Sequence, residues 1–138
     1  MRDLPIEEAA RHEWEALVIP GGWPDGGYNE IYQEPVLSII QRTWERDGII
    51  ATSCTGIFPV GEAGLLRGRR ATTFVSPGGC AFCSENKDRL AAYGAIVCNG
   101  PMVADQRIFS DIGPGVCTST ALELFRAFIG ESGVSRLQ

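Results

Sequence analysis

Residues 49–56 read Ile-Ile-Ala-Thr-Ser-Cys-Thr-Gly, a short apolar run that leads into small residues around one cysteine. The apolar half predicts a buried strand, and a helical stretch to about Gly64 is expected to follow it. Cys54 then lies at a strand–turn–helix elbow, the geometry that exposes a nucleophile above an α/β sheet, although the serine version reads G-x-S-x-G. A thiol at a helix N-terminus also faces the positive end of the helix dipole, which favours its thiolate. The alternative is a buried, inert cysteine, the commonest state of a free thiol.

A second glycine-bounded strand precedes this elbow. Residues 15–19 predict a short buried strand that Pro20-Gly21-Gly22 ends. The two glycines allow the backbone to approach a ligand closely. The N–H groups of Gly21 and Gly22, with the amide of Thr55, are therefore candidates for an oxyanion hole. A plain turn is the alternative interpretation of the same residues.

Strands and helices alternate along the chain. Further elements are predicted as helices over 5–13, 35–47, 85–93 and 118–129 and as strands over 69–73, 95–98, 102–104 and 107–109. The last helix is expected to carry Leu122, Phe125 and Ile129 on one face and to end at Gly130. This alternation predicts a layered α/β fold with a mainly parallel sheet. Ligands of such sheets bind beyond the carboxyl ends of the strands, where Gly21 and Cys54 are both expected.

Composition excludes several classes of protein. The 138 residues are enough for one domain, which we expect to span 1–138. The net charge is −5 and the longest basic cluster is Arg67, Arg69 and Arg70, so neither nucleic acid nor an anionic membrane is an expected partner. The apolar runs are too short to span a bilayer. An acidic N-terminal segment and an odd count of five cysteines favour a reduced, cytoplasmic protein over a disulfide scaffold.

The remaining reactive side chains are weaker candidates. Cys80 and Cys83 form a C-x-x-C, typical of a redox pair or half a zinc site, but no second such motif exists, so coincidental thiols are the favoured interpretation. No metal and no cofactor is predicted. His12, the only histidine, is expected to face solvent on the opening helix, so no Cys–His pair is visible. Asp25 and Glu30 are the acids nearest the glycine pair, and both are predicted to be solvated.

Four segments together resemble the DJ-1/PfpI superfamily, which has the class I glutamine amidotransferase-like fold. They are Val18–Gly22, Ile50–Gly56, Gly61–Thr73 and Val103–Gly115, and the resemblance runs from about Leu4 to Gly130. It implies a flavodoxin-like three-layer sandwich with Cys54 as the elbow cysteine and the amides of Gly22 and Thr55 as oxyanion donors. PfpI-type proteases place a histidine after the cysteine, whereas Thr55 is more similar to the isonitrile hydratase branch.

Two departures from the family pattern bear on activity. The family's activating carboxylate belongs to a strand–helix–strand unit that precedes the segment beginning here near Leu4, so the chain is expected to lack both. Many members also place a histidine after the Thr-Thr pair, where this chain has Phe74 at the edge of the expected pocket. A sheet without its first strand leaves backbone groups and an apolar face uncovered. We therefore expect a homodimer or completion by another chain.

The resemblance implies hydrolase or lyase chemistry on a small electrophile such as an aldehyde, an amide or an isonitrile. The Cys54 thiolate would attack, and the amides of Gly22 and Thr55 would stabilise the developing charge. The alternative is a non-catalytic member that senses redox state, acts as a chaperone or regulates a partner. The missing carboxylate and Phe74 favour this second hypothesis.

Overall fold

The computed structural model describes residues 4–23, 26–75 and 81–136, with backbone alone for 81–84. Its helices are α1 (Ile6–Ala9), α2 (Val36–Glu45), α3 (Ile57–Glu62), α4 (Ala81–Ala92) and α5 (Cys117–Val134), with 3₁₀ turns η2 (Tyr28–Tyr32) and η3 (Cys54–Gly56). Its strands are β1 (Ala16–Ile19), β2 (Ile49–Ser53), β3 (Arg70–Ala71), β4 (Ile96–Val97), β5 (Met102–Asp105) and β6 (Ile108–Asp111). The predicted alternation of strands and helices is confirmed.

The sheet is mainly parallel, as predicted. Its four strands follow the order β1-β2-β6-β5, and β1, β2 and β6 run parallel. Only β5 is antiparallel to its neighbour, because a tight turn joins it to β6. The register pairs Ile19 with Thr52 and Ser53 with Asp111, so the carboxyl ends of three strands meet beside Cys54.

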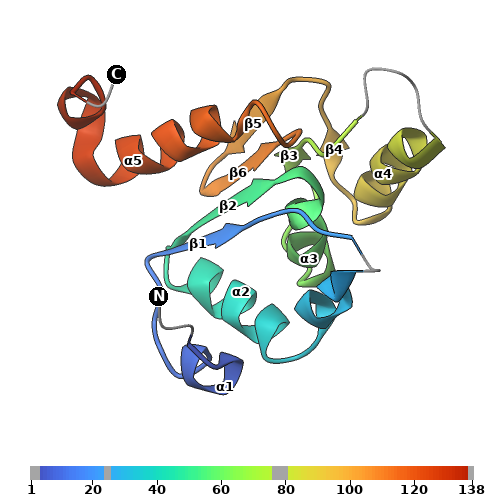
Figure 1. Cartoon of the computed structure of the whole chain (residues 1–138), viewed down its shortest axis with the longest axis horizontal. Helices are drawn as coiled ribbons and strands as arrows, with labels where there is room; N and C mark the ends of the chain where they lie inside the picture. Colours follow the sequence, from blue (N-terminus) through green and yellow to red (C-terminus); the bar gives the residue numbers. More distant parts are fainter. Residues whose placement is uncertain (1–3, 24–25, 76–80, 137–138) are drawn as a thin grey trace.

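Helices cover both faces of this sheet and make three layers. Figure 1 shows α2 and α3 on one face and α5 on the other. The core between the sheet and α2 and α3 contains Ile40, Ile50, Phe58 and Ile108, each at most 1% exposed. This arrangement is the flavodoxin-like sandwich that the sequence predicts.

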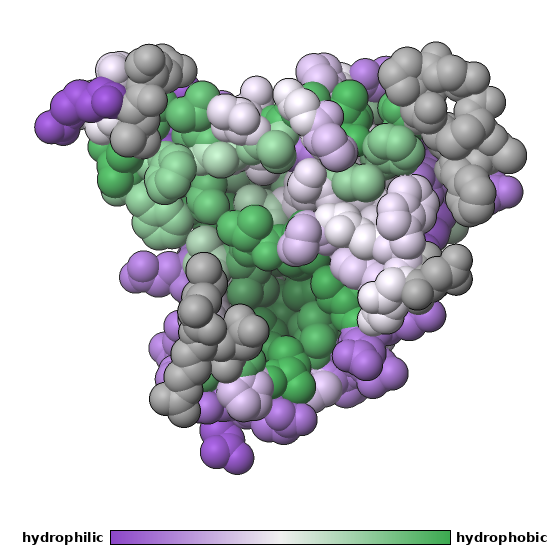
Figure 2. All heavy atoms as spheres, viewed as in Figure 1, coloured by the Kyte–Doolittle hydropathy of each residue, from purple (hydrophilic) through white to green (hydrophobic). Residues whose placement is uncertain are grey.

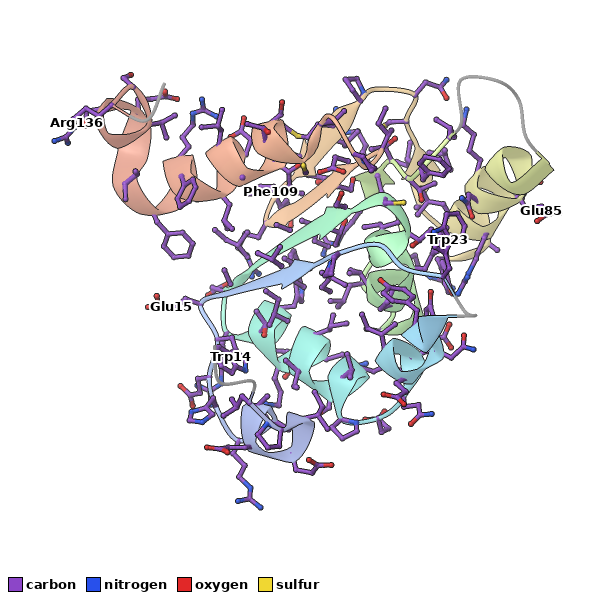
Figure 3. All side chains as sticks on the ribbon, in the orientation of Figure 1. Trp14, Glu15, Trp23, Glu85, Phe109 and Arg136 are labelled. Carbon is purple, nitrogen blue, oxygen red and sulfur yellow. The ribbon has the colours of Figure 1, made fainter. Side chains whose placement is uncertain are left out.

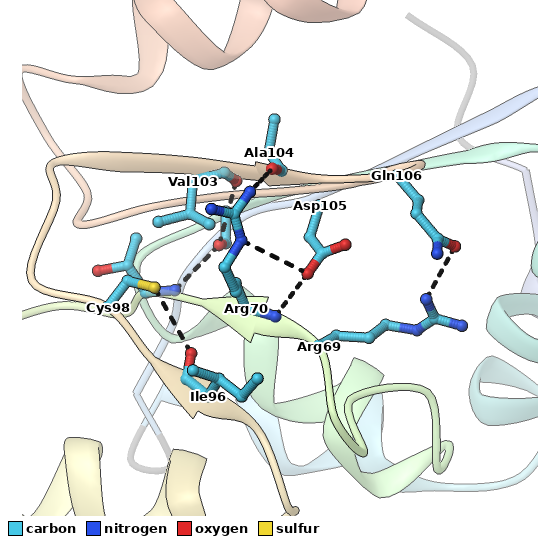
Figure 4. Close-up of polar contacts among 10 residues, drawn as sticks. Arg69, Arg70, Ile96, Cys98, Val103, Ala104, Asp105 and Gln106 are labelled. Atoms are coloured by element: carbon cyan, nitrogen blue, oxygen red, sulfur yellow. Dashed lines mark hydrogen bonds and ion pairs between the residues drawn. The ribbon is translucent and has the colours of Figure 1, made fainter.

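A short second sheet of β3 and β4 joins the first through side chains. The backbone N–H of Arg70 donates to Asp105 Oδ2 at 2.6 Å, and Arg69 Nη1 donates to Gln106 Oε1 at 2.9 Å (Figure 4). The N–H of Thr72 donates to Ser110 Oγ at 3.1 Å. Side-chain oxygens of β5, β6 and the turn between them therefore accept hydrogen bonds from residues 69–72, in place of the carbonyl oxygens of a neighbouring strand. The strand predicted over 69–73 is only two residues long in the structure.

The opening helix is shorter than predicted. It ends at Ala9, so His12 lies beyond it. Trp14 Nε1 donates to the carbonyl of Ala9 at 3.0 Å, and the Arg42 guanidinium donates to the carbonyls of Ala10 and His12. Because these side chains bind the carbonyls that a longer helix would use, the chain turns towards β1 instead.

The final helix also departs from its prediction. Gly130 leaves helical geometry with φ 68° and ψ 176°, but a second helical segment follows it to Val134. Phe125 and Ile129, two of the apolar residues predicted to share one face, are each 48% exposed. The helix runs past the end of the sheet, so nothing in the described chain covers this part of its apolar face (Figure 1). No helix of the described residues is long and apolar enough to cross a bilayer.

The outer edge of β1 pairs with no other described strand. Val18, at its centre, is 68% exposed. A hollow of about 380 Å³ lies on the α2 side of the strand, lined by Leu17, Val36 and Ile39 among other apolar residues. A smaller hollow of about 100 Å³ lies on the α5 side. Figure 2 shows the hydrophobic surface that results, in the centre of the view where Figure 1 places β1.

Candidate functional site: a cysteine at a strand–helix elbow

Cys54 has the backbone geometry of a nucleophile elbow. Ser53 ends β2 in an extended conformation with φ −122° and ψ 140°, and Cys54 then turns to φ 60° before η3 and α3 begin. A non-glycine residue adopts a positive φ rarely and at a cost in backbone energy. The Cys54 carbonyl accepts a hydrogen bond from Thr73 Oγ1 at 3.1 Å, which helps to hold the turn. The chain therefore maintains an unfavourable conformation at its candidate nucleophile.

Two glycines let the backbone approach the cysteine side chain. A Cβ atom on Gly21 would lie 2.6 Å from Cys54 Cβ and 3.0 Å from its Sγ. A Cβ atom on Gly113, whose φ is 110°, would lie 3.2 Å from Cys54 Cβ. The loop after β1 and the loop after β6 thus enclose the thiol from two sides, and a side chain on Gly21 would displace it.

Thr55 connects the elbow to the glycine loop. The N–H of Gly22 donates to Thr55 Oγ1 at 3.0 Å, and the Thr55 hydroxyl lies 3.0 Å from the Gly22 carbonyl, to which it can donate. Thr55 also lies close enough to the Cys54 sulfur to lower the pKa of the thiol. The structure therefore brings Gly21, Gly22, Cys54 and Thr55 together, with the Gly22 amide engaged by a hydroxyl.

Burial raises the pKa of the Cys54 thiol above its ordinary value of 9.0. The hydrogen bonds from Thr55 lower this pKa, and the negative charge of Asp111 raises it further. Burial prevails, so the elbow geometry is present while the thiol stays protonated near neutral pH.

Asp111 is a site residue that the sequence analysis did not single out. Its side chain is 1% exposed and accepts three hydrogen bonds: from Ser53 Oγ at 2.7 Å, from the Gly113 N–H at 2.8 Å and from Thr120 Oγ1 at 2.5 Å. These bonds join the end of β2, the glycine loop and α5. A buried carboxylate with this many donors is a structural anchor for the three segments.

Phe74 lies beside the same glycine as the thiol. Its Cδ2 atom is 3.6 Å from the position of a Cβ on Gly113, and its ring meets the Trp23 ring edge-on with centroids 6.3 Å apart. Asn86 Nδ2 donates to the Phe74 carbonyl at 3.2 Å and ties α4 to this loop. An apolar ring therefore borders the elbow.

The sequence of this chain matches a known protein family over most of its length. Residues 1–127 match the model of the DJ-1/PfpI family. The chain belongs to the DJ-1/PfpI family.

This chain aligns with only part of the length of each relative. Isonitrile hydratase of Pseudomonas putida is 29% identical over 116 residues, which are 84% of this chain and 46% of that protein. An uncharacterised protein of Streptomyces lividans is 66% identical over 75 residues, 51% of this chain and 48% of its own. The chain thus spans about half the length of the curated relatives it matches.

Solved structures agree on the fold. Drosophila melanogaster DJ-1beta superposes with a TM-score of 0.79 at 20% identity, over 95% of this chain and 65% of that one. A mutant of a DJ-1 superfamily protein from Salmonella typhimurium superposes with a TM-score of 0.75 at 25% identity, over 96% and 66%.

The other candidates lie apart from the elbow of this DJ-1/PfpI domain. His12 stacks near Trp14, with ring centroids 5.6 Å apart, at the amino end of β1, whereas Trp23 and the elbow lie at its carboxyl end (Figure 3). Glu30 is exposed on η2. Asp25 and the Cys80–Cys83 motif, with Cys83 described only in its backbone, fall outside the side chains that the structure describes.

Proposed function

We propose that this DJ-1/PfpI domain uses Cys54 as the nucleophile of hydrolase or lyase chemistry on a small electrophile such as an aldehyde, an amide or an isonitrile. The observation that supports it most is the φ of 60° at Cys54, between two glycines that hold the sulfur. A strained elbow of this kind is typical of nucleophile sites. The similarity to isonitrile hydratase, at 29% identity, supports the same class of chemistry.

In this proposal the thiolate forms a C–S bond with the electrophilic carbon. With an aldehyde or an amide the π electrons of the carbonyl move onto its oxygen, and with an isonitrile the terminal carbon keeps the electron pair and takes a proton from water. The Thr55 amide is the first donor to that developing charge. The Gly22 amide becomes the second when the Thr55 hydroxyl, its present acceptor, turns away. An amide adduct then expels its amine, which takes a proton, and water hydrolyses the resulting thioester to the acid and the free thiol. An isonitrile adduct adds water at the same carbon and leaves the sulfur as a formamide. An aldehyde with a neighbouring carbonyl passes a proton from the hemithioacetal carbon to that carbonyl, and water hydrolyses the resulting thioester. Gly21 lets the backbone of its loop lie close to the Cys54 side chain. Phe74 forms an apolar wall of the site and has no group that can donate or accept a proton.

The direct test measures turnover of small aldehydes, amides and isonitriles by the wild type, by Cys54→Ser and by the control Cys98→Ser. We expect activity with one of these classes that rises with pH, that Cys54→Ser abolishes and that Cys98→Ser retains. Equal activity of wild type and Cys54→Ser would refute the assignment.

One alternative is a non-catalytic member that reports on oxidants, and the apolar ring of Phe74 beside the elbow favours it because that ring offers no base. There hydrogen peroxide would oxidise the thiol to a sulfenic acid and itself be reduced to water. The same protein samples distinguish the two hypotheses. Absence of turnover, together with a gain of one oxygen at Cys54 under dilute peroxide, would favour the sensor.

We further propose that a second copy of this chain pairs along the open edge of β1. Val18 is 68% exposed there, and apolar hollows lie on both faces of the strand, so an identical apolar edge would cover it. Completion by a different chain is the other outcome, and solution mass separates the two. The proposal also includes a single domain over 1–138. It includes a cytoplasmic location as well, which the odd count of five cysteines favours.

A further inference from the structure

A cavity of about 320 Å³ adjoins the elbow, and the mechanism above makes no use of it. Gly22 and Thr55 belong to its wall and to the elbow at once. Aromatic rings of Trp23, Tyr28 and Tyr32 line the rest, and Arg89 of α4 enters it as the one cationic side chain among its described lining residues. A volume of this size holds a molecule the size of a substituted benzene ring.

Arg89 is held by rings rather than by a counter-ion. Its guanidinium carbon lies 4.4 Å from the centroid of the Phe58 ring and 5.1 Å from that of Tyr32. Its Nε and Nη2 reach the Tyr93 hydroxyl only at 3.4 and 3.3 Å. That hydroxyl donates to Glu62 Oε2 at 3.0 Å, so the carboxylate is bound one group away from the guanidinium.

No described carboxylate lies within ion-pair distance of Arg89. Stacking on aromatic faces fixes the plane of a guanidinium. The partners of the Arg89 N–H groups are neutral hydroxyls at long distances, and a carboxylate is a stronger acceptor that can replace them. Glu85 also borders the cavity but is exposed, and Figure 3 shows it at the outer margin of α4, away from Trp23. Arg89 is exposed as well, so the lining carries a positive side chain and a negative one at different points of its open margin.

This charge pattern selects among anions. One guanidinium balances one negative charge, and the fork of N–H donors matches a carboxylate in two parallel hydrogen bonds. A phosphate dianion would need further donors and would meet the rim charge of Glu85. Tyr28 adds no charge at neutral pH, because burial and its neighbours Tyr32 and Cys54 raise its pKa to about 12. Its hydroxyl donates to the Pro20 carbonyl at 2.5 Å, which leaves the ring as the contact surface.

We propose that this cavity binds a small aromatic carboxylate, with Arg89 on the carboxylate, the rings of Trp23, Tyr28 and Tyr32 on its body and its opposite end at Thr55. The inference rests on the proposed function in one respect: it places the reactive carbon of the substrate at the end nearest Cys54. It thereby narrows the substrate class to electrophiles that carry an anionic group about one ring away.

The test separates binding from chemistry. The probes are 4-methylbenzoate and its methyl ester, which have the same body and carry none of the aldehyde, amide or isonitrile groups of the proposed substrates. Calorimetry measures both with the wild type, Arg89→Gln, Arg89→Lys and the control Arg67→Gln, an exposed arginine that does not line this cavity. We expect the wild type and Arg67→Gln to prefer the carboxylate about tenfold. Arg89→Gln should lose the preference and Arg89→Lys should keep part of it.

Equal affinities of acid and ester for the wild type would overturn the proposal, as would binding of neither probe or an unchanged preference in a folded Arg89→Gln. Cys54→Ala should bind the acid as the wild type does, because recognition does not use the thiol. Retained binding beside an inert Cys54 would refute the proposed function and leave this site standing. Reactive Cys54 without carboxylate preference would refute this site alone.

Discussion

The elbow around Cys54 and the edge of β1 lie at neighbouring parts of one sheet, yet they differ in how completely the chain satisfies them. At the elbow, Asp111, Thr55 and Thr73 engage the surrounding polar groups, and two glycines enclose the sulfur. At the edge, Val18 faces solvent between two apolar hollows. The chain thus contains the parts that shape its candidate nucleophile, while the described residues leave the edge of the sheet uncovered. The geometry of the elbow and the burial of the sheet edge are separate properties, and different substitutions are expected to disrupt each of them.

The largest effect is expected from a substitution that disrupts the proposed pairing along the edge of β1. Val18→Lys places a charge in the proposed β1–β1 interface, where it would be buried without a partner. We expect the dissociation constant of the assembly to rise about a hundredfold, or about 2.7 kcal/mol. Analytical ultracentrifugation at low micromolar concentration measures it.

The matched control is Ile96→Lys. Ile96 is also an exposed strand residue, at 54%, but it lies on β4. Its mass distribution should equal that of the wild type. A wild type that is a sharp monomer near 14.9 kDa with cooperative thermal unfolding would contradict the assembly proposal.

The next substitution damages the elbow and leaves the edge intact. In Gly21→Ala the new methyl group would lie 2.6 Å from Cys54 Cβ, so the thiol or the loop must move. We expect a loss of about 2 kcal/mol in unfolding free energy and a roughly tenfold slower alkylation of Cys54. Gly26→Ala is the control, since a Cβ there meets nothing within 4 Å. Equal alkylation rates of the two variants would show that Gly21 does not confine the thiol.

A smaller effect isolates the donors to sulfur. Thr55→Val removes the hydroxyl whose hydrogen bond lowers the pKa of Cys54, so that pKa should rise further. Alkylation of Cys54 at pH 8 should slow about fivefold. Thr55→Ser keeps the hydroxyl and should resemble the wild type. Faster alkylation in Thr55→Val would mean that the hydroxyl stabilises the protonated thiol instead.

The smallest expected change concerns the apolar wall. Phe74→His supplies a ring that can exchange a proton beside the elbow. Any turnover of small aldehydes should rise about twofold, and Phe74→Leu, which removes the ring without adding a base, should not raise it. If Phe74→His changes neither turnover nor Cys54 alkylation, the residue has no part in the site.

The sequence predicts the elbow better than it predicts what surrounds it. Glycines next to a short apolar run are a local signal, and they indicated that the Gly21–Gly22 loop lies beside Cys54, whereas the approach of Gly113 was not predicted. Asp111 escaped notice because its bond to Ser53 spans 58 positions and exists only when β6 pairs with β2. The same applies to Arg89, whose stack on Phe58 depends on how α4 packs against α3. The early end of α1 depends on Arg42, which lies 32 and 30 positions along the chain from the two carbonyls it binds.

The central claim is that this chain builds the elbow but keeps its thiol protonated, and the pH dependence of Cys54 alkylation tests it most directly. Iodoacetamide labelling of the wild type, read by peptide mapping with exposed Cys117 as the internal reference, gives the profile. Because burial raises the pKa of Cys54, its thiolate fraction at pH 7 should be below that of an ordinary thiol. We therefore predict slow labelling at pH 7 and a midpoint above 9.0. A midpoint at or below about 8.5 would contradict the account, because it would require an activating group that the described residues do not supply.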